Sequence, residues 1–252
     1  MFFCACASTK NIRPAGLPHA VDNDARTGEA FFKQAVSYNW RERDSLALEY
    51  ANAGQVPDFY FSFVPVTTTF MRADDKEVKV TFYVAPDYFM VGTHRNWARV
   101  PITPMAAQKI AEVYDCFLPT PSMVDAIYKA STVKLAPVPM YAFRDSTITM
   151  WQHHLMIEGQ RNNRKGLIAG IKKDVVLSNK VVEHQKPNRV AIYGWHTLDG
   201  KPIQPVYAGH VNWYVDYSHG IRLIAKKVKM DGIWVDYTAL FEAVNETKML
   251  RY

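Results

Sequence analysis

One short segment of this sequence, residues 196–222, has the highest density of polar side chains that could transfer a proton. It holds three of the eight histidines, and these lie close to acidic, hydroxyl and guanidinium groups. Imidazoles exchange protons near neutral pH, and a neighbouring carboxylate can orient them. The segment therefore predicts an acid–base site whose catalytic candidates are His196, His210, Asp216, Ser218 and His219.

Four further residues are candidates for substrate binding: Arg222, Trp195, Tyr217 and Lys173. A guanidinium binds a carboxylate or stabilises an oxyanion, and aromatic rings stack on sugars or peptides. Lys173 follows Lys172 inside an apolar run, where an alternating strand would bury one of the two lysines. A buried lysine needs a partner, which would be Asp174, Asp216 or a bound anion.

The expected geometry of the site depends on a strand over residues 211–217. On such a strand Asp216 and Ser218 point to one side, and Tyr217 and His219 point to the other. Adjacent Ser218 and His219 then cannot form a nucleophile–base pair, so we expect His219 to meet His196 or His210. The alternative is structural: Asp216 and Ser218 cap a turn, and the histidines fill polar gaps in the core.

A cofactor is not predicted, although a divalent metal is an alternative use of the same residues. His196, His210, His219 and Asp216 offer the nitrogen and oxygen ligands that zinc accepts. Their spacing matches neither HxH nor HExxH. The sequence also contains no GxSxG, GxGxxG or P-loop motif, so the motifs of a nucleophile elbow, a dinucleotide site and an NTPase are all missing.

The elements that must position these residues predict an α+β fold with predominantly antiparallel sheet and several short helices. Helices are expected from Thr27 with a break near Asn39, over 103–118 and 120–131 with Thr103 and Thr120 as caps, over 150–162, and over 237–245. The first of the two threonine-capped helices would contain Cys116. Strands are expected over 59–70, 77–86 and 88–93 as a β-meander, then over 167–178, 188–196, 210–218 and 221–237. The dipeptide Asp231–Gly232 predicts a hairpin turn in the last of these.

The bulk properties are those of a globular protein of 252 residues with a net charge of +6. Residues 1–25 are expected to form a flexible tether or signal remnant, and 26–252 a single domain. Basic residues are scattered, so nucleic acid is not expected as a partner, and no stretch predicts a transmembrane helix. The start "MFFCACASTK" is similar to the end of a bacterial lipoprotein signal, with Cys6 as the lipid-anchor candidate. A frayed terminus with incidental cysteines is the alternative.

Two resemblances bear on function. The stretch "DYSHGIRL" resembles the SHGC motif of L,D-transpeptidases, but the catalytic cysteine of that motif is missing between Gly220 and Ile221. Because that family acts through a thiolate, its mechanism is not carried over. The segments "VAIYGWH", "GKPIQP" and "DYSHGIRL" together resemble a family of uncharacterised bacterial secreted proteins or lipoproteins. This resemblance implies a shared fold unit and export, with no established reaction. The expected location is secreted or periplasmic, with a lipoprotein anchored to the membrane through Cys6 as the alternative.

Taken together, the sequence favours an exported cell-envelope hydrolase or transferase that acts on an amide or glycan, either an envelope polymer or a small molecule. Its alternative is a non-catalytic module that binds peptidoglycan or carbohydrate through aromatic loops around Trp195, Trp213, Tyr214 and Tyr217. A purely structural role for the histidines is the third interpretation.

Overall fold

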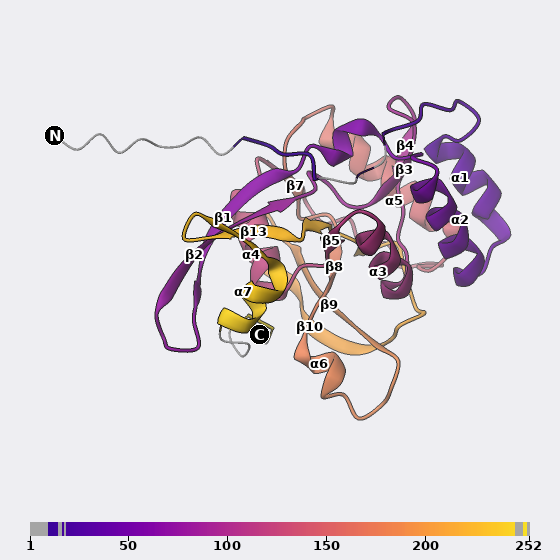
Figure 1. Ribbon diagram of the computed structural model, residues 1–252. Coiled ribbons are helices and arrows are strands. Elements are labelled where there is room, and N and C mark those ends of the chain that lie inside the picture. The colour runs from indigo at the N-terminus through magenta and orange to yellow at the C-terminus, as the bar shows by residue number, and fades with distance from the viewer. Residues whose placement is uncertain (1–9, 15–16, 18, 245–248, 251–252) are drawn as a thin grey trace.

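The computed structural model describes residues 10–14, 17, 19–244 and 249–250. These residues form seven α-helices and fourteen strands, most of them antiparallel, which confirms the predicted α+β fold (Figure 1). The helices are α1 Gly28–Gln34, α2 Trp40–Asn52, α3 Pro104–Val113, α4 Pro121–Ala130, α5 Thr147–Arg161, α6 Asn179–Val182 and α7 Tyr237–Ala243, with 3₁₀ turns η1 Ala35–Ser37 and η2 Asp58–Phe61.

The strands fall into four sheets. The largest has the order β14-β13-β2-β12-β5, with β1 also paired to β2, and the second has the order β10-β9-β8-β11. The strands are β1 Val64–Met71, β2 Glu77–Val84, β3 Met90–Gly92, β4 Trp97–Arg99, β5 Cys116–Phe117, β6 Val133–Lys134, β7 Ile168–Ala169, β8 Lys173–Val176, β9 Arg189–His196, β10 Pro202–Val211, β11 His219–Gly220, β12 Ile224–Ala225, β13 Lys227–Met230 and β14 Ile233–Asp236.

The predicted helix starts are confirmed by their caps. The Thr27, Thr103 and Thr120 side chains each accept a hydrogen bond from a backbone N–H in the first turn, which satisfies a donor that has no partner within the helix. The first long helix breaks at Asn39, as predicted. Asn39 and Glu42 form a reciprocal capping box there, so the break is also the start of α2.

Three element predictions were wrong. Residues 59–61 form a 3₁₀ turn, and β3 pairs with β4 and not with β2, so the three strands make no meander. Helix α3 ends at Val113, and Cys116 lies in strand β5, where its side chain is buried. Residues 212–218 form turns, whereas a strand was expected.

The expected tether makes several contacts with the domain in its described part. Ile12 and Phe63 exchange two backbone hydrogen bonds, of 3.0 and 2.8 Å, and Arg13 forms an ion pair with Asp58. Val21 N donates to Gly54 O at the end of α2. Cys6, the candidate for the lipid anchor, lies outside the described residues, so that anchor stays a prediction.

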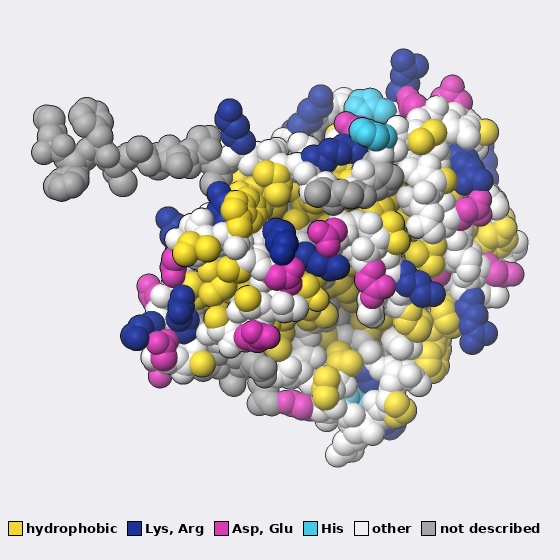
Figure 2. Space-filling model, in the orientation of Figure 1, with side chains coloured by type: hydrophobic (Ala, Val, Ile, Leu, Met, Phe, Trp, Pro, Cys, Tyr) yellow, Lys and Arg dark blue, Asp and Glu magenta, His cyan; other side chains and the backbone are white. Residues whose placement is uncertain are grey.

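Helices α1 and α2 lie at one side of the molecule, and the long β1–β2 hairpin reaches out at the other (Figure 1). Acidic, basic and apolar side chains are interspersed over the face drawn in Figure 2. Within the described part of the chain, no helix combines the length and the apolar character that crossing a bilayer requires.

Candidate functional site

The four-stranded sheet β10-β9-β8-β11 carries most of the candidate site residues on its two faces. Ile192 packs in the main core with Val175, whereas Ala191 and Tyr193 pack with Val176 in a smaller cluster on the other face. Regular alternation along β9 would place Trp195 on the face of Tyr193.

A pair of residues with positive φ reverses this alternation. Gly194 has φ +101° and Trp195 has φ +56°, so the Trp195 side chain joins the main core. The His196 ring turns to the face of Tyr193, where both side chains contact Asp125. A Cβ at Gly194 would lie 3.2 Å from Val124 Cγ1 and 3.4 Å from the His196 ring, so this fold of β9 favours glycine.

The first cavity, which we call the His210 pocket, is an open hollow of about 440 Å³. It lies where the start of β8, the strand β10, the loop before α5 and the loop before β11 meet. Its lining residues are Arg144, Lys173, Gln204, Tyr207, His210, Tyr214 and Asp216. Three of these were predicted as site residues: Lys173, His210 and Asp216.

Asp216 is the centre of a hydrogen-bond network at the base of this pocket. Its Oδ1 accepts from the backbone N (2.8 Å) and Oγ (2.6 Å) of Ser218, and its Oδ2 accepts from Arg144 Nη2 (2.9 Å) and Nε (3.2 Å). Burial alone would raise the pKa of Asp216, but the neighbouring His219 ring, Ser218 and Arg144 together hold it well below its ordinary value. Asp216 is therefore ionised at neutral pH and fixes Arg144.

His219 lies beneath this pocket and does not line it. Its side chain is 1% exposed, and its Nε2 has no hydrogen-bond partner among the described residues. Nε2 is 3.9 Å from Asp216 Oδ1, which is too long for a hydrogen bond. Burial lowers the pKa of His219 to about 4, so the ring is neutral at pH 7. The hydroxyl of Ser218 is also buried and donates to Asp216, so it is not placed as a nucleophile.

His210 is the imidazole that faces the pocket. Its ring centre lies 4.8 Å from that of Tyr214, 5.1 Å from that of Tyr207 and 5.7 Å from that of His219. Partial burial lowers its pKa, which favours the neutral ring. A neutral imidazole at the wall of an open pocket can accept a proton from a bound molecule.

Lys172 and Lys173 are both buried, one on each side of the backbone. Lys172 points into the core, where its Nζ contacts Tyr217 O and lies 3.2 Å from His153 Nδ1, and burial lowers its pKa to about 7. Lys173 is 8% exposed and lines the pocket, with Nζ 5.2 Å from the centre of the Trp195 ring. Among the described residues Lys173 forms no ion pair. Asp216 lines the same pocket and favours the charged form of Lys173 without a direct ion pair, so a bound anion fits beside the lysine.

Three of the predicted substrate contacts are interior residues. Arg222 is fully buried, donates to Ile168 O and Ala85 O, and stacks 4.0 Å from the centre of the Tyr88 ring. Trp195 and Tyr217 pack against each other in the main core. Trp195 is 6% exposed and the other two are fully buried, so these positions leave almost no surface for a substrate. The guanidinium at the pocket belongs to Arg144, which sequence reasoning missed because it lies 72 residues from Asp216.

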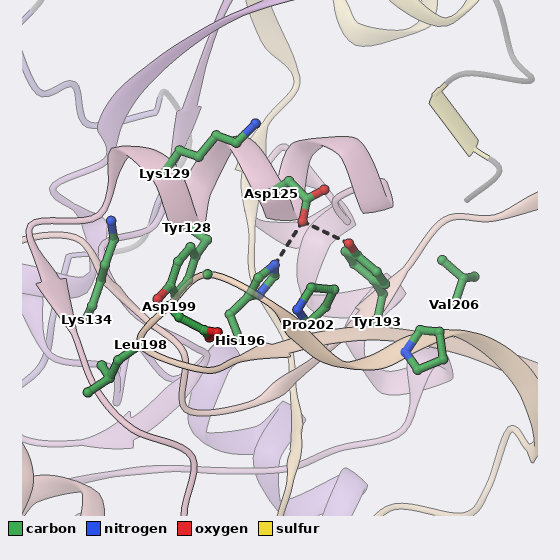
Figure 3. A pocket seen from close by; sticks show the side chains of 12 residues that line it. Asp125, Tyr128, Lys129, Lys134, Tyr193, His196, Leu198, Asp199, Pro202 and Val206 are labelled. Atoms are coloured by element: carbon green, nitrogen blue, oxygen red, sulfur yellow. Dashed lines mark hydrogen bonds and ion pairs between the residues drawn. The ribbon is translucent and has the colours of Figure 1, made fainter.

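His196 lines a second cavity, of about 650 Å³, on the other face of the sheet; we call it the Asp125 pocket (Figure 3). His196 Nε2 and Tyr193 Oη both lie 2.9 Å from Asp125 Oδ1. The His196 ring stacks on Tyr128 with ring centres 4.5 Å apart. The cavity lies between α4 and the β9–β10 hairpin, and it is lined by Asp125, Tyr128, Lys129, Lys134, Tyr193, His196, Leu198, Asp199, Gly200, Pro202, Pro205 and Val206.

The structure thus brings His210, Asp216 and Lys173 together at one pocket and places His196 at another. His196 therefore does not line the same pocket as His210. Within the described ranges no three His, Cys, Asp or Glu side chains converge in a way that could hold a metal ion. Asp125 was also missed, since one acid on an amphipathic helix carries no signal that it faces a histidine 71 residues later.

Comparisons of this chain with models of protein families, with curated proteins and with solved structures found no match.

Proposed function

We propose that this protein is a hydrolase or transferase of the cell envelope that acts on an anionic amide or glycan substrate at the His210 pocket. The observation that carries the proposal is the position of one neutral, pocket-facing imidazole, His210, beside the cations of Arg144 and Lys173. Asp216 offsets one of the two positive charges, so the pocket keeps an excess of one. An anionic substrate group is the ligand that this balance favours.

In an amide hydrolysis of this kind, His210 would accept a proton from a water molecule as its oxygen attacks the carbonyl carbon. The carbon–nitrogen bond then breaks, and the protonated imidazole returns the proton to the leaving amine. In a transfer reaction an acceptor amine replaces the water. Lys173 and Arg144 would stabilise the negative charge that develops on the carbonyl oxygen or hold a substrate carboxylate.

The test uses purified protein, peptidoglycan sacculi and soluble muropeptides, with released fragments or exchanged products measured by mass spectrometry. His210→Ala should lower the rate by about 10²–10⁴-fold, the usual contribution of a general acid–base residue. Arg144→Met and Lys173→Met should mainly raise KM. His184→Ala, at a partly exposed histidine outside both pockets, is the matched control. A His210→Ala protein that keeps the wild-type rate would contradict the proposal.

A non-catalytic binding module is the second candidate, because aromatic side chains stand exposed near the same pocket. Tyr207 lines it, Trp213 precedes Tyr214, and Tyr141 and Phe143 precede Arg144, all four with large exposed areas. Exposed rings of this kind stack on sugars. Retention of the protein on sacculi without release of any fragment, and weaker retention of Trp213→Ala, would favour this function over catalysis.

A further inference from the structure

The Asp125 pocket separates a cationic and an anionic group by a stack of two rings. Lys134 Nζ lies 4.9 Å from the centre of the Tyr128 ring, and the His196 ring covers the other face of that ring at 4.5 Å. Asp125 contacts the far edge of His196. Figure 3 shows this order, with Lys134, Tyr128 and His196 side by side and Asp125 above His196.

Two lysines bring positive charge to this pocket. Lys134 and Lys129 line the pocket and form no ion pair within the described part of the chain. The acid nearest the hairpin tip, Asp199, is engaged by the Thr197 hydroxyl and lies 3.7 Å from Lys201 Nζ. Lys134, at the end of the ring stack away from Asp125, is therefore the group left for an anionic part of a ligand.

The wall opposite α4 is apolar. Leu198, Pro202, Pro205 and Val206 of the β9–β10 hairpin form it, and Leu198 is a large hydrophobic side chain that the fold leaves exposed. Contact with a ligand's apolar side chains would remove this surface from water, which is favourable. The cavity thus offers a carboxylate, ammonium groups and an apolar wall within one volume.

The anionic end is held in place by the strained segment of β9. Trp195 adopts φ +56°, a conformation that costs a bulky residue free energy, and this turn brings His196 to Asp125. Tyr193 Oη and His196 Nε2 both contact the same Asp125 oxygen, which fixes the orientation of the carboxylate. Strain that persists where it orients a carboxylate in a cavity is typical of a binding site.

We infer that the Asp125 pocket binds a short peptide with a free amino group and a free carboxyl group. The peptide's ammonium binds at Asp125, its carboxylate at Lys134, and its side chains lie on the apolar wall. An extended chain advances about 3.5 Å per residue, so two or three residues span the ring stack. This site lies on the other face of the sheet from His210 and does not depend on the function proposed for that residue.

The test is a binding titration by calorimetry with alanine, trialanine and hexa-alanine, and with trialanine that is N-acetylated or C-amidated. Trialanine should bind tightest, and each blocked form should bind at least about tenfold more weakly because one charge-assisted contact is lost. Asp125→Asn and Lys134→Met should weaken trialanine binding by a similar factor. Lys201→Met removes an exposed lysine that does not line the pocket and should leave binding unchanged, as should His210→Ala.

Each remaining outcome overturns the proposal. If trialanine does not bind, or if both blocked forms bind as well as the free peptide, the pocket does not recognise the two termini. If Lys201→Met weakens binding as much as Lys134→Met, the attraction is a general effect of surface charge. Thermal melting of every variant, compared with wild type, separates a lost contact at Asp125 from a lost fold.

Discussion

The two pockets differ in how their histidine is held, although both lie on the sheet β10-β9-β8-β11. In the Asp125 pocket, His196 is buried, stacked on Tyr128 and within hydrogen-bond distance of a carboxylate. In the His210 pocket, the imidazole forms no hydrogen bond to a carboxylate among the described residues and contacts aromatic rings instead. The Asp216 carboxylate there is engaged by Arg144 and Ser218. A histidine beside an aspartate is therefore not in itself the better acid–base candidate, since the free ring is the one that a substrate can reach.

The two pockets also differ in how their charged groups are arranged. Asp216 leaves one cation in excess around His210, whereas the Asp125 pocket places acid and base at two ends of a ring stack. The first arrangement suits an anion that reacts, and the second suits a ligand that carries both charges. The variants below test, in each pocket, which residues stabilise the fold and which are available to bind a ligand.

The largest effect is expected for His219, the buried histidine beneath the His210 pocket. His219→Ala should lower the free energy of unfolding by about 3 kcal/mol, since it removes a fully buried ring and leaves a cavity. His210→Ala should cost about 1 kcal/mol or less, because that ring is partly exposed. Urea denaturation measures both values. Equal costs for the two variants would mean that His219 does not support the pocket from below.

Because His219 is buried and neutral, the stability of the protein should also depend on pH. The unfolded chain takes up the His219 proton near its ordinary pKa of 6.5, whereas the folded protein takes it up only near its lowered pKa of about 4. The stabilisation is therefore complete above pH 6.5 and is lost as the pH falls toward 4, by roughly 3 kcal/mol at most.

Denaturation curves between pH 7 and pH 4 measure this loss. His153 and His154 are also buried with lowered pKa values and act in the same direction, so the informative quantity is the difference between wild type and His219→Gln. The variant should lose less stability over this range. Parallel curves for the two proteins would show that His219 does not titrate with folding.

A smaller contrast is expected between the two carboxylates. Asp216→Asn should cost about 2–3 kcal/mol, because Asp216 is buried and replacing its charge weakens the contacts with Arg144 and Ser218. Asp125→Asn should cost about 1 kcal/mol, because the Asp125 side chain is 20% exposed and water can compensate. Guanidinium denaturation of both variants gives the two values. A greater cost at Asp125 would make it a structural residue and weaken its assignment to a ligand.

The fold could be predicted from local signals, and the site only in part. The threonine caps before α1, α3 and α4 and the Asp231–Gly232 hairpin turn are properties of a few adjacent residues, so the sequence contains them directly. The pairing of β3 could not be predicted in this way, because it depends on which strands occupy the edge of β2. Strands β12 and β13, from the C-terminal part of the chain, pair with β2 there.

The candidate site likewise combines residues that local sequence patterns predict with residues that only long-range contacts bring together. Counting polar residues near strand ends found His210, Asp216 and Lys173, because the segment "HVNWYVDYSHG" brings two of them together by proximity. Alternation failed at Trp195, where two positive φ angles reverse the faces of β9, and at residues 212–218, which form turns. Arg144 and Asp125 needed tertiary contacts more than 70 residues apart, which single-sequence patterns do not reveal.

The smallest effect is expected at Phe143, which stands beside Arg144 with φ +47° and 82% of its side chain exposed. A bulky residue in this left-handed conformation costs about 1 kcal/mol, and asparagine tolerates it better. Phe143→Asn should therefore raise the free energy of unfolding by roughly 0.5 kcal/mol, as the lost packing of an exposed ring is small. Tyr141→Asn is the matched control, since Tyr141 is 86% exposed and has no positive φ.

Phe143 differs in this respect from Trp195, whose strained backbone is held by core packing against Tyr217. Phe143 is 82% exposed and directly precedes Arg144, which lines the His210 pocket, so we expect the benefit of its strained backbone to appear with substrate. We would measure the free energy of unfolding and the retention on sacculi of both Phe143→Asn and Tyr141→Asn. If Phe143→Asn is more stable than wild type but binds sacculi less well than Tyr141→Asn, the ring is held for ligand contact. If it is less stable, Phe143 supports the loop of Arg144, and the rim belongs to the fold.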